Sequence, residues 1–362
     1  MKVLVLANND GGLYRFRKEL LEALVANGHQ VYISLPWGER VEDLKEIGCT
    51  YIETNMDRRG MNPLKDMKLF FHYRKIIRTV KPDQIITYTI KPNIYGGFAA
   101  RLAKIPYALT ITGLGSAFQK KGILRKMVTM MYKIACGKVH VVYFENTGNQ
   151  KVFLQEKIVR EDTTCVLNGA GVNLEDFPYE PYPMDPGPTR FLFVGRVMRE
   201  KGVDELLNAM KALRQEGQDC TLEILGGYEE DYIETIRHCE ESGWLKYHGF
   251  QPDVRPFMAA CHCSVLPSWH EGMSNTNLEA AATGRPIITS NVYGCKEAVL
   301  NNESGFLAEA GNWESLYQEM KRFLELSPEQ RHAMGEAGRR HIEAQFDKKV
   351  VVKKTLERLF VN

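Results

Sequence analysis

Two glutamates flank what the sequence predicts to be the start of a helix. Glu271 and Glu279 lie in HEGMSNTNLEAAATGRP, residues 270–286. If Ser274 or the next residue caps the helix, its first backbone N–H groups are free to bind an anion such as phosphate. Glu279, about one turn inside the helix, can accept two hydrogen bonds from a ribose diol. Glu271 precedes the helix, on the side where a sugar attached to the phosphate would lie, and Gly272 permits close approach. The pattern therefore predicts a nucleotide-sugar site.

Two other interpretations of this pair stay open. A glycosidase also uses two carboxyl groups, but both must face one bond, and a loop acid with a helix acid suits that less well. In the plainest interpretation, Glu271 is a solvated loop residue and Glu279 a surface residue of the helix, because their spacing alone is a weak signal.

Two cations can serve the same site. The stretch FLFVGRVMREKGVDELLNAM, residues 191–210, is typical of a strand, a short loop and a helix, and Arg196 and Lys201 follow the strand. Arginine offers a planar fork and lysine a point charge, so the two can neutralise a departing diphosphate. The alternative is a pair of solvated surface cations.

These loops require a scaffold of parallel strands. Short apolar runs alternate with amphipathic helical patterns along the chain, which is typical of a parallel sheet covered on both faces. A segment with five prolines, residues 177–190, interrupts the alternation, which then restarts. We therefore predict an α/β protein with two doubly wound, Rossmann-like domains. Ligands of such sheets bind beyond the carboxyl ends of the strands, so an interdomain cleft is the expected site. The predicted boundaries are 1–176 for the N-terminal domain, 177–189 for a proline-rich linker, 190–345 for the C-terminal domain and 346–362 for a final helix returning to the first domain.

Composition narrows the class of protein. The chain has 362 residues and eight scattered cysteines without a CxxC pair, which favours reduced thiols in a cytoplasmic protein over disulfides. No apolar run approaches the ~18 residues of a membrane span. Residues 58–138 contain 17 lysines and arginines but only two aspartates. Nucleic acid, an anionic membrane or a phosphorylated substrate can each explain that charge, and so can a solvated basic surface.

Part of this basic region has the pattern of a membrane-surface helix. Residues 119–138 can form a helix in which Lys121, Arg125 and Lys133 lie in a row beside the apolar face, and Lys120 and Lys126 add to the positive charge. The pattern suits shallow docking on an anionic bilayer, although an ordinary core helix with basic flanks fits as well. The apolar face of this helix is expected to contain Ile123, Leu124, Met127, Val128 and Met131.

Several motifs of the chain together resemble those of a known enzyme family. GRVMREKG, followed by LPSWHEGMSNTNLEAAATGRPIITS, resembles the retaining glycosyltransferases of family 4, which have the GT-B fold. NNDGGLYRFRKELLEAL, TYTIKPNIYGGFAARLAKIPY, ITGLGSAF and NGAGVNLEDF are similar to a subgroup that elongates undecaprenyl-diphosphate-linked sugars and includes capsule and O-antigen transferases. The resemblance covers essentially the whole chain, with an acceptor-binding first domain and a donor-binding second domain.

The resemblance implies a role for each matching residue. Glu271, Arg196 and Lys201 would be catalytic, with Glu271 contacting the donor sugar and the two cations its diphosphate. Many family members have a histidine where this chain has Thr112 and Gly113, so that contact is missing or replaced. The other substrate-binding positions would be Gly11 and Gly12 under the reacting groups, Lys91 at the acceptor diphosphate, His248, Gly249 and Phe250 beside the base, Gly272, Met273, Ser274 and Asn275 as backbone amides, and Glu279 at the ribose.

The expected reaction moves a hexose or HexNAc from a UDP-sugar to a polyprenyl-diphosphate-linked saccharide, with retention at the anomeric carbon. No metal motif such as DxD stands at a strand end, so we expect a metal-independent reaction without a cofactor. The enzyme would be cytoplasmic and peripheral at the inner face of the cell membrane. A sugar-nucleotide epimerase of similar fold, or a transferase with a soluble acceptor, is the alternative. A nucleic-acid binder would leave the glutamate pair unexplained.

Overall fold

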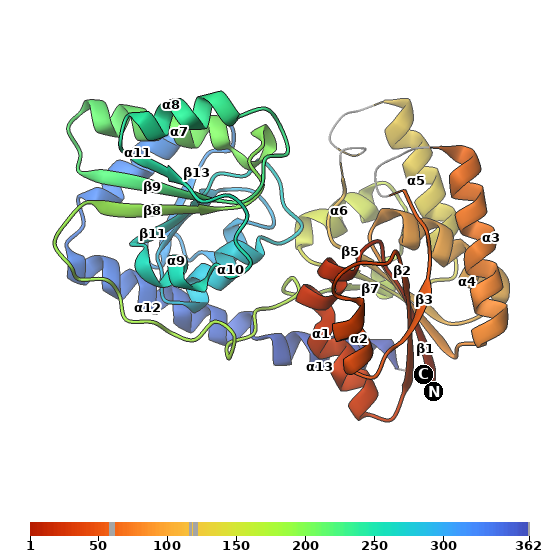
Figure 1. Ribbon diagram of the computed structural model, residues 1–362. Helices are drawn as coiled ribbons and strands as arrows, with labels where there is room; N and C mark the ends of the chain where they lie inside the picture. The colour runs from red at the N-terminus through yellow and green to blue at the C-terminus, as the bar shows by residue number, and fades with distance from the viewer. Residues whose placement is uncertain (58–61, 116–117, 119–121, 361–362) are drawn as a thin grey trace. The chain divides into compact units, whose positions relative to one another are not determined.

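The computed structural model describes residues 1–57, 62–115, 118 and 122–360. The chain divides into two compact units (Figure 1). Unit 1 contains Met1–Ala170 and the chain end from Lys348, and unit 2 contains Gly171–Asp347.

Unit 1 is built on a seven-stranded parallel sheet with the order β3-β2-β1-β4-β5-β6-β7. Its central strands are buried along almost their whole length because helices cover both faces. The strands are β1 (Lys2–Leu6), β2 (Gln30–Leu35), β3 (Thr50–Glu53), β4 (Gln84–Tyr88), β5 (Tyr107–Ile111), β6 (Val141–Phe144) and β7 (Thr164–Val166). The helices are α1 (Asp10–Ala26), α2 (Val41–Glu46), α3 (Pro63–Val80), α4 (Gly97–Ala103), α5 (Ile123–Cys136), α6 (Thr147–Gln155) and α13 (Lys348–Leu359), with a π-helix, η1 (Pro92–Gly96), before α4.

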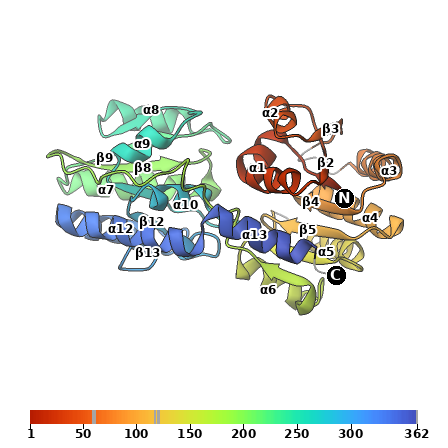
Figure 2. The ribbon, with the colours of Figure 1, turned by 90° about the horizontal axis from the view of Figure 1, so that it is seen from below.

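Alternate residues of the central strands divide unit 1 into two cores. Val3 and Val5 of β1 face a core that includes side chains of α1, α2 and α13. Leu4 and Leu6 face the other core, which includes side chains of α3, α4, α5 and α6. The final helix, α13, packs beside α1 (Figure 2).

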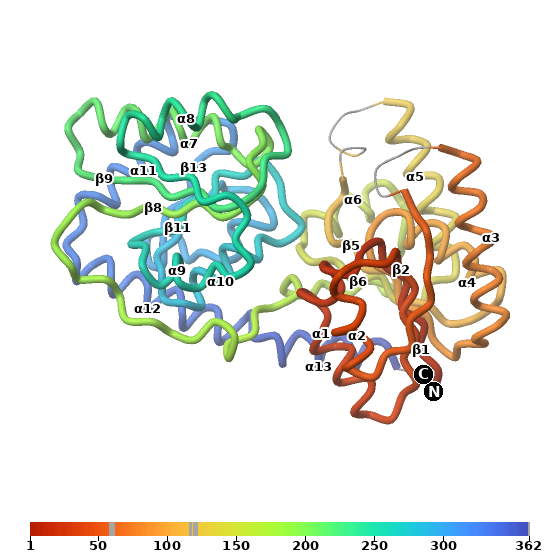
Figure 3. The backbone as a smooth tube through the Cα atoms, in the orientation of Figure 1, coloured from red at the N-terminus to blue at the C-terminus, as the bar shows by residue number. Residues whose placement is uncertain are grey.

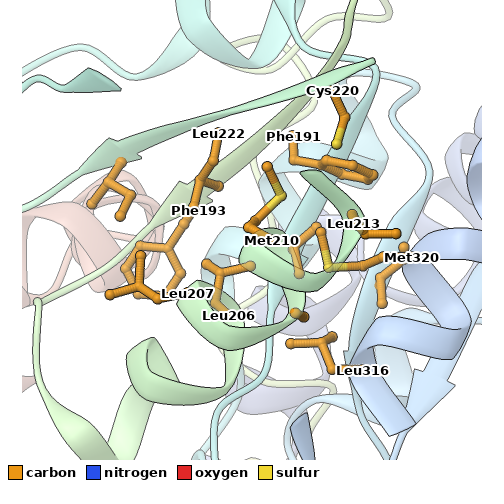
Figure 4. Packing of buried hydrophobic residues seen from close by; sticks show 14 of the residues in the cluster. Phe191, Phe193, Leu206, Leu207, Met210, Leu213, Cys220, Leu222, Leu316 and Met320 are labelled. Atoms are coloured by element: carbon orange, nitrogen blue, oxygen red, sulfur yellow. The ribbon is translucent and has the colours of Figure 1, made fainter. Parts of the chain in front are cut away.

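Unit 2 repeats the plan with six parallel strands in the order β10-β9-β8-β11-β12-β13. The strands are β8 (Thr189–Val194), β9 (Cys220–Leu225), β10 (Leu245–Tyr247), β11 (Cys263–Leu266), β12 (Ile287–Ser290) and β13 (Gly305–Ala308). The helices are α7 (Val203–Gln215), α8 (Ile233–Glu241), α9 (Arg255–Ala260), α10 (Asn275–Ala282), α11 (Trp313–Leu324) and α12 (Pro328–Gln345). Figure 4 shows one core of this unit, where Phe191 and Phe193 of β8 lie with Leu206 and Met210 of α7 and Met320 of α11.

The proline-rich segment that we expected to be a linker is part of unit 2, which begins at Gly171. Residues 177–189 run along α12 (Figure 3). The fully buried Arg285 anchors the segment by donating to the carbonyl oxygens of Glu180, at 3.0 Å, and Pro181, at 2.9 Å. The linker prediction is therefore corrected. The composition of this segment is typical of a linker, but the Arg285 side chain that fixes the segment lies about a hundred residues further along the chain.

The predicted apolar face of α5 also needs correction. Val128 is buried, and Leu124 and Met131 pack against the core of unit 1. The opposite face of the helix exposes Ile123, Met127, Met130 and Ile134. Apolar side chains thus occupy both faces of α5, so the spacing of apolar residues could not show which face is buried. Lys120 and Lys121 lie outside the described residues.

Over the parts of the chain that the structure describes, no helix is both long enough and apolar enough to cross a membrane.

Candidate functional site

In unit 2, Lys201 and Glu271 lie together at the carboxyl ends of neighbouring strands. Lys201 ends a short 3-10 helix, η4 (Arg199–Lys201), after β8, and Glu271 lies in the loop between β11 and α10. The Lys201 ammonium group donates to the Glu271 carboxylate, and the two side chains are only 18% and 14% exposed. The strand order reverses between β8 and β11, which is where open α/β sheets bind ligands. The structure therefore brings two of the three predicted catalytic residues together.

Close packing of two loops sets this contact. Gly202 has a φ of +75°, and a Cβ there would lie 2.1 Å from the Pro267 carbonyl oxygen. The Trp269 backbone N–H donates to the Glu200 carbonyl oxygen at 2.9 Å. A left-handed glycine thus lets the loop after β8 lie directly against the end of β11.

The start of α10 faces the same end of the sheet. Ser274 is its N-cap, and its hydroxyl accepts from the Asn277 backbone N–H at 3.2 Å. Met273 and Glu279 are buried, so Glu279 is not a solvated surface residue. A cap, free N–H groups and a buried carboxylate fit a phosphate followed by a ribose.

A buried thiol lies close to this site without taking part in its chemistry. Burial raises the pKa of Cys295, and the Glu271 charge raises it further, so this cysteine is a neutral thiol at pH 7 and not a nucleophile.

Arg196 and the predicted base-binding residues contact partners that we did not predict. The half-exposed Arg196 guanidinium lies 3.5 Å from the Glu229 carboxylate.

Among the predicted base-binding residues, His248 Nε2 lies 3.1 Å from the Glu223 carboxylate, and Phe250 is 76% exposed. Two tyrosines after β9 and on β10 also gather here, with the Tyr228 and Tyr247 rings 4.7 Å apart. No motif marks these partners, since each comes from another strand. Gly249 has a left-handed φ of +66°, and its carbonyl oxygen accepts from Gly226 N–H at 2.8 Å.

In unit 1, the loops after β1 and β4 lie at the corresponding reversal of strand order. Gly11 and Gly12 are in the first turn of α1, where the Asn9 side chain accepts from the Gly12 N–H at 2.5 Å. A Cβ at Gly12 would lie 2.9 Å from that oxygen, so the turn favours a glycine. Thr112 and Gly113 follow β5 and are partly exposed.

Lys91 belongs to a small polar cluster after β4. Its ammonium group lies 2.7 Å from the Asp66 carboxylate, and both side chains are less than one-fifth exposed. Tyr95 donates to the other oxygen of Asp66 at 3.1 Å. Thr89 has a φ of +71°, which is costly for a β-branched residue and common at functional sites. Sequence reasoning missed Asp66 and Tyr95, because Asp66 lies 25 positions before Lys91 in a helix of its own.

A cysteine–histidine–cysteine stretch, residues 261–263, leads into β11 and is part of the core. Cys261 and Cys263 are buried, and His262 Nδ1 accepts from the Arg190 backbone N–H at 3.0 Å. Burial lowers the pKa of His262 to about 4. Within the described ranges, no three His, Cys, Asp or Glu side chains are grouped so that they could hold a metal ion.

Comparison with known proteins identifies the chain. Residues 2–146 match the family model "Glycosyl transferase 4-like", and residues 180–341 match "Glycosyl transferases group 1". The chain is 28% identical over 342 residues to the N,N'-diacetylbacillosaminyl-diphospho-undecaprenol alpha-1,3-N-acetylgalactosaminyltransferase of Campylobacter jejuni, covering 90% of each. It is 27% identical to the UDP-Gal:alpha-D-GlcNAc-diphosphoundecaprenol alpha-1,3-galactosyltransferase of Escherichia coli, covering 73% of this chain and 72% of that one.

Solved structures show the same fold. The structure of Anabaena HepE in complex with UDP-glucose superposes with a TM-score of 0.81 at 18% identity, covering 99% of this chain and 100% of that one. The two family models together span most of the chain, one in each unit. The chain therefore belongs to the family-4-like glycosyltransferases, with the GT-B fold.

Proposed function

We propose that this glycosyltransferase moves a hexose or HexNAc from a UDP-sugar to a saccharide on polyprenyl diphosphate, in bacterial surface polysaccharide or glycan assembly. The observation that carries the proposal is the Lys201–Glu271 pair beside the capped start of α10, with Glu279 buried within that helix. The acceptor class is supported by the relatives from C. jejuni and E. coli, whose names specify undecaprenol-linked substrates.

In the proposed mechanism, the α10 amides and Lys201 receive the diphosphate, and Arg196 adds a second cation. Charge builds on the leaving phosphate in the transition state, so cations placed in advance lower the barrier. When Lys201 turns to the phosphate, the Glu271 carboxylate is released to position the sugar and to stabilise positive charge on its ring. The acceptor hydroxyl attacks from the face that the phosphate leaves, and the phosphate oxygen takes its proton. The anomeric configuration is therefore retained.

Unit 1 supplies the acceptor side of the proposal. Lys91, held by Asp66, would bind the acceptor diphosphate. Seventeen large apolar side chains among the described residues are exposed, and eight of them lie on the neighbouring helices α3, α4 and α5. An exposed apolar surface with flanking lysines suits the interface of an anionic bilayer, so we propose peripheral binding at the inner face of the cell membrane. We call these eight residues the apolar outer face: Leu64, Met67, Phe71, Leu102, Ile123, Met127, Met130 and Ile134.

The test is transfer from a panel of UDP-sugars to a polyprenyl-diphosphate-linked saccharide, with product linkage read by NMR. Retained configuration and full activity in EDTA are expected, since Lys201 and Arg196 supply the positive charge. Activity that chelation abolishes and Mg²⁺ or Mn²⁺ restores would overturn the roles of the two cations. Conversion of the UDP-sugar without any acceptor would instead indicate an epimerase.

A further inference from the structure

A groove of about 400 Å³ lies on the flank of α5, beside the end of α6. It is separate from the residues assigned above to the donor and acceptor. Its polar and charged lining comes from one side of α5, with one acid from the end of α6, and the lining includes Arg125, Lys126, Thr129, Met130, Lys133 and Glu156.

The groove is positively charged. The Arg125 guanidinium lies 2.6 Å from the Glu156 carboxylate, which fixes Arg125 and cancels its charge. Lys126 and Lys133 are exposed, and neither forms an ion pair with any residue that the structure describes. The two lysines are seven positions apart, so they lie on the same side of the helix. The groove therefore has two positive charges that are not cancelled by an ion pair with any described residue and can bind an anion.

Thr129 gives the groove a hydrogen-bonding group that its surroundings do not use. It lies between the two lysines on the same side of α5 and is only 7% exposed. Its hydroxyl has no hydrogen-bond partner among the described residues. Buried polar groups in native proteins are almost always satisfied, so an unsatisfied hydroxyl on a residue that lines a cationic groove points to a ligand oxygen.

We propose that this groove binds the phosphate group of an anionic phospholipid. The non-bridging phosphate oxygens would accept from Lys126, Lys133 and the Thr129 hydroxyl together. Met130 lines the groove and belongs to the apolar outer face, so a phosphate bound here has apolar surface beside it for the start of the acyl chains. The apolar surface beside the groove favours a lipid over free phosphate as the ligand. The assignment rests on the proposed membrane binding but not on the identity of the transferred sugar.

The experiment compares two kinds of vesicle with equal surface charge. One contains phosphatidylcholine and phosphatidylglycerol, and the other contains phosphatidylcholine and oleate, whose charge is a carboxylate. Wild-type protein should bind the phosphatidylglycerol vesicles more tightly. Thr129→Val should bind them about tenfold more weakly, since it removes one hydrogen bond to a charged group, while binding to the oleate vesicles stays unchanged. Thr129→Ser keeps the hydroxyl and should keep the preference.

Further variants and a soluble ligand distinguish the ways in which the proposal could be wrong. Lys126→Gln and Lys133→Gln should each weaken the preference, whereas Lys211→Gln, the same single charge change on α7, should not. Equal binding of wild type to both vesicles would overturn the phosphate site while leaving membrane binding intact. No binding to either vesicle would overturn the membrane proposal as well. Binding of glycerol 3-phosphate in solution that matches vesicle affinity would show a site for free phosphate. If Thr129→Val does not fold, the serine and lysine variants decide the outcome.

Discussion

Lys201 and Glu271 neutralise each other. This pairing keeps two charges from being desolvated alone, and in the proposed mechanism each becomes available when the donor diphosphate competes for the ammonium group. In that mechanism the pair joins phosphate binding to the positioning of the sugar. Glu279, by contrast, is buried within α10 itself.

The two glutamates should separate binding from turnover. Glu279→Gln should weaken UDP binding about tenfold, since it removes a charged acceptor for the ribose. Glu271→Gln should leave UDP affinity equal or higher, because Lys201 becomes free for the phosphate, and should lower kcat by about a hundredfold. Calorimetry with UDP and initial-rate kinetics measure the two effects. Equal losses of UDP affinity in both variants would contradict this division of roles.

Lys91 should act on the acceptor alone. Lys91→Gln should raise the KM for the lipid-linked acceptor at least about tenfold, because a charge-assisted contact to phosphate is lost. Asp66→Asn keeps the hydrogen bond from Tyr95 but releases Lys91, so it should change acceptor KM less. UDP affinity, measured by calorimetry, should be the same in all three proteins. A loss of UDP affinity in Lys91→Gln would place this lysine on the donor side.

At the scale of elements, the approach of η4 to the end of β11 decides where Lys201 lies. Two glycines allow a matched comparison, because Gly202 and Gly217 have nearly the same left-handed φ, +75° and +78°. A Cβ at Gly217 meets no atom within 4 Å, whereas one at Gly202 meets the Pro267 backbone.

Alanine at these two positions should therefore have different effects. Gly217→Ala should cost about 1 kcal/mol of stability, from backbone strain only. Gly202→Ala should cost about 3 kcal/mol or more, because the clash forces the loops apart, and it should also weaken UDP binding by displacing Lys201. Thermal unfolding and UDP titration read the two effects. Similar results for both variants would show that the close approach of these loops does not matter.

At the scale of the molecule, the apolar outer face should govern membrane binding. Ile123→Ser with Met130→Ser should weaken binding to anionic vesicles by about tenfold or more, because two exposed side chains no longer insert. Val350→Ser, at another exposed apolar position, on α13, is the control and should bind like wild type. Transfer to a short soluble acceptor should be unchanged in all variants. Full vesicle binding by the double variant would assign the apolar outer face another partner.

The sequence by itself determined the local structure and the class of chemistry. The spacing of apolar residues along each strand and helix reflects which residues are buried. The cap at Ser274 is a contact within one turn. Both are properties of neighbouring residues, so they could be predicted. The motifs around Arg196, Lys201 and Glu271 identified the family for the same reason.

Only the tertiary structure decided which residues meet across the chain. It joined Lys201 to Glu271 and Lys91 to Asp66, and it fixed the proline-rich segment to unit 2 through Arg285. It also chose which apolar side of α5 is buried, since both sides have helical spacing. The physical reason is that partners 25 to 105 positions apart are set by how strands and helices pack, which local spacing does not encode.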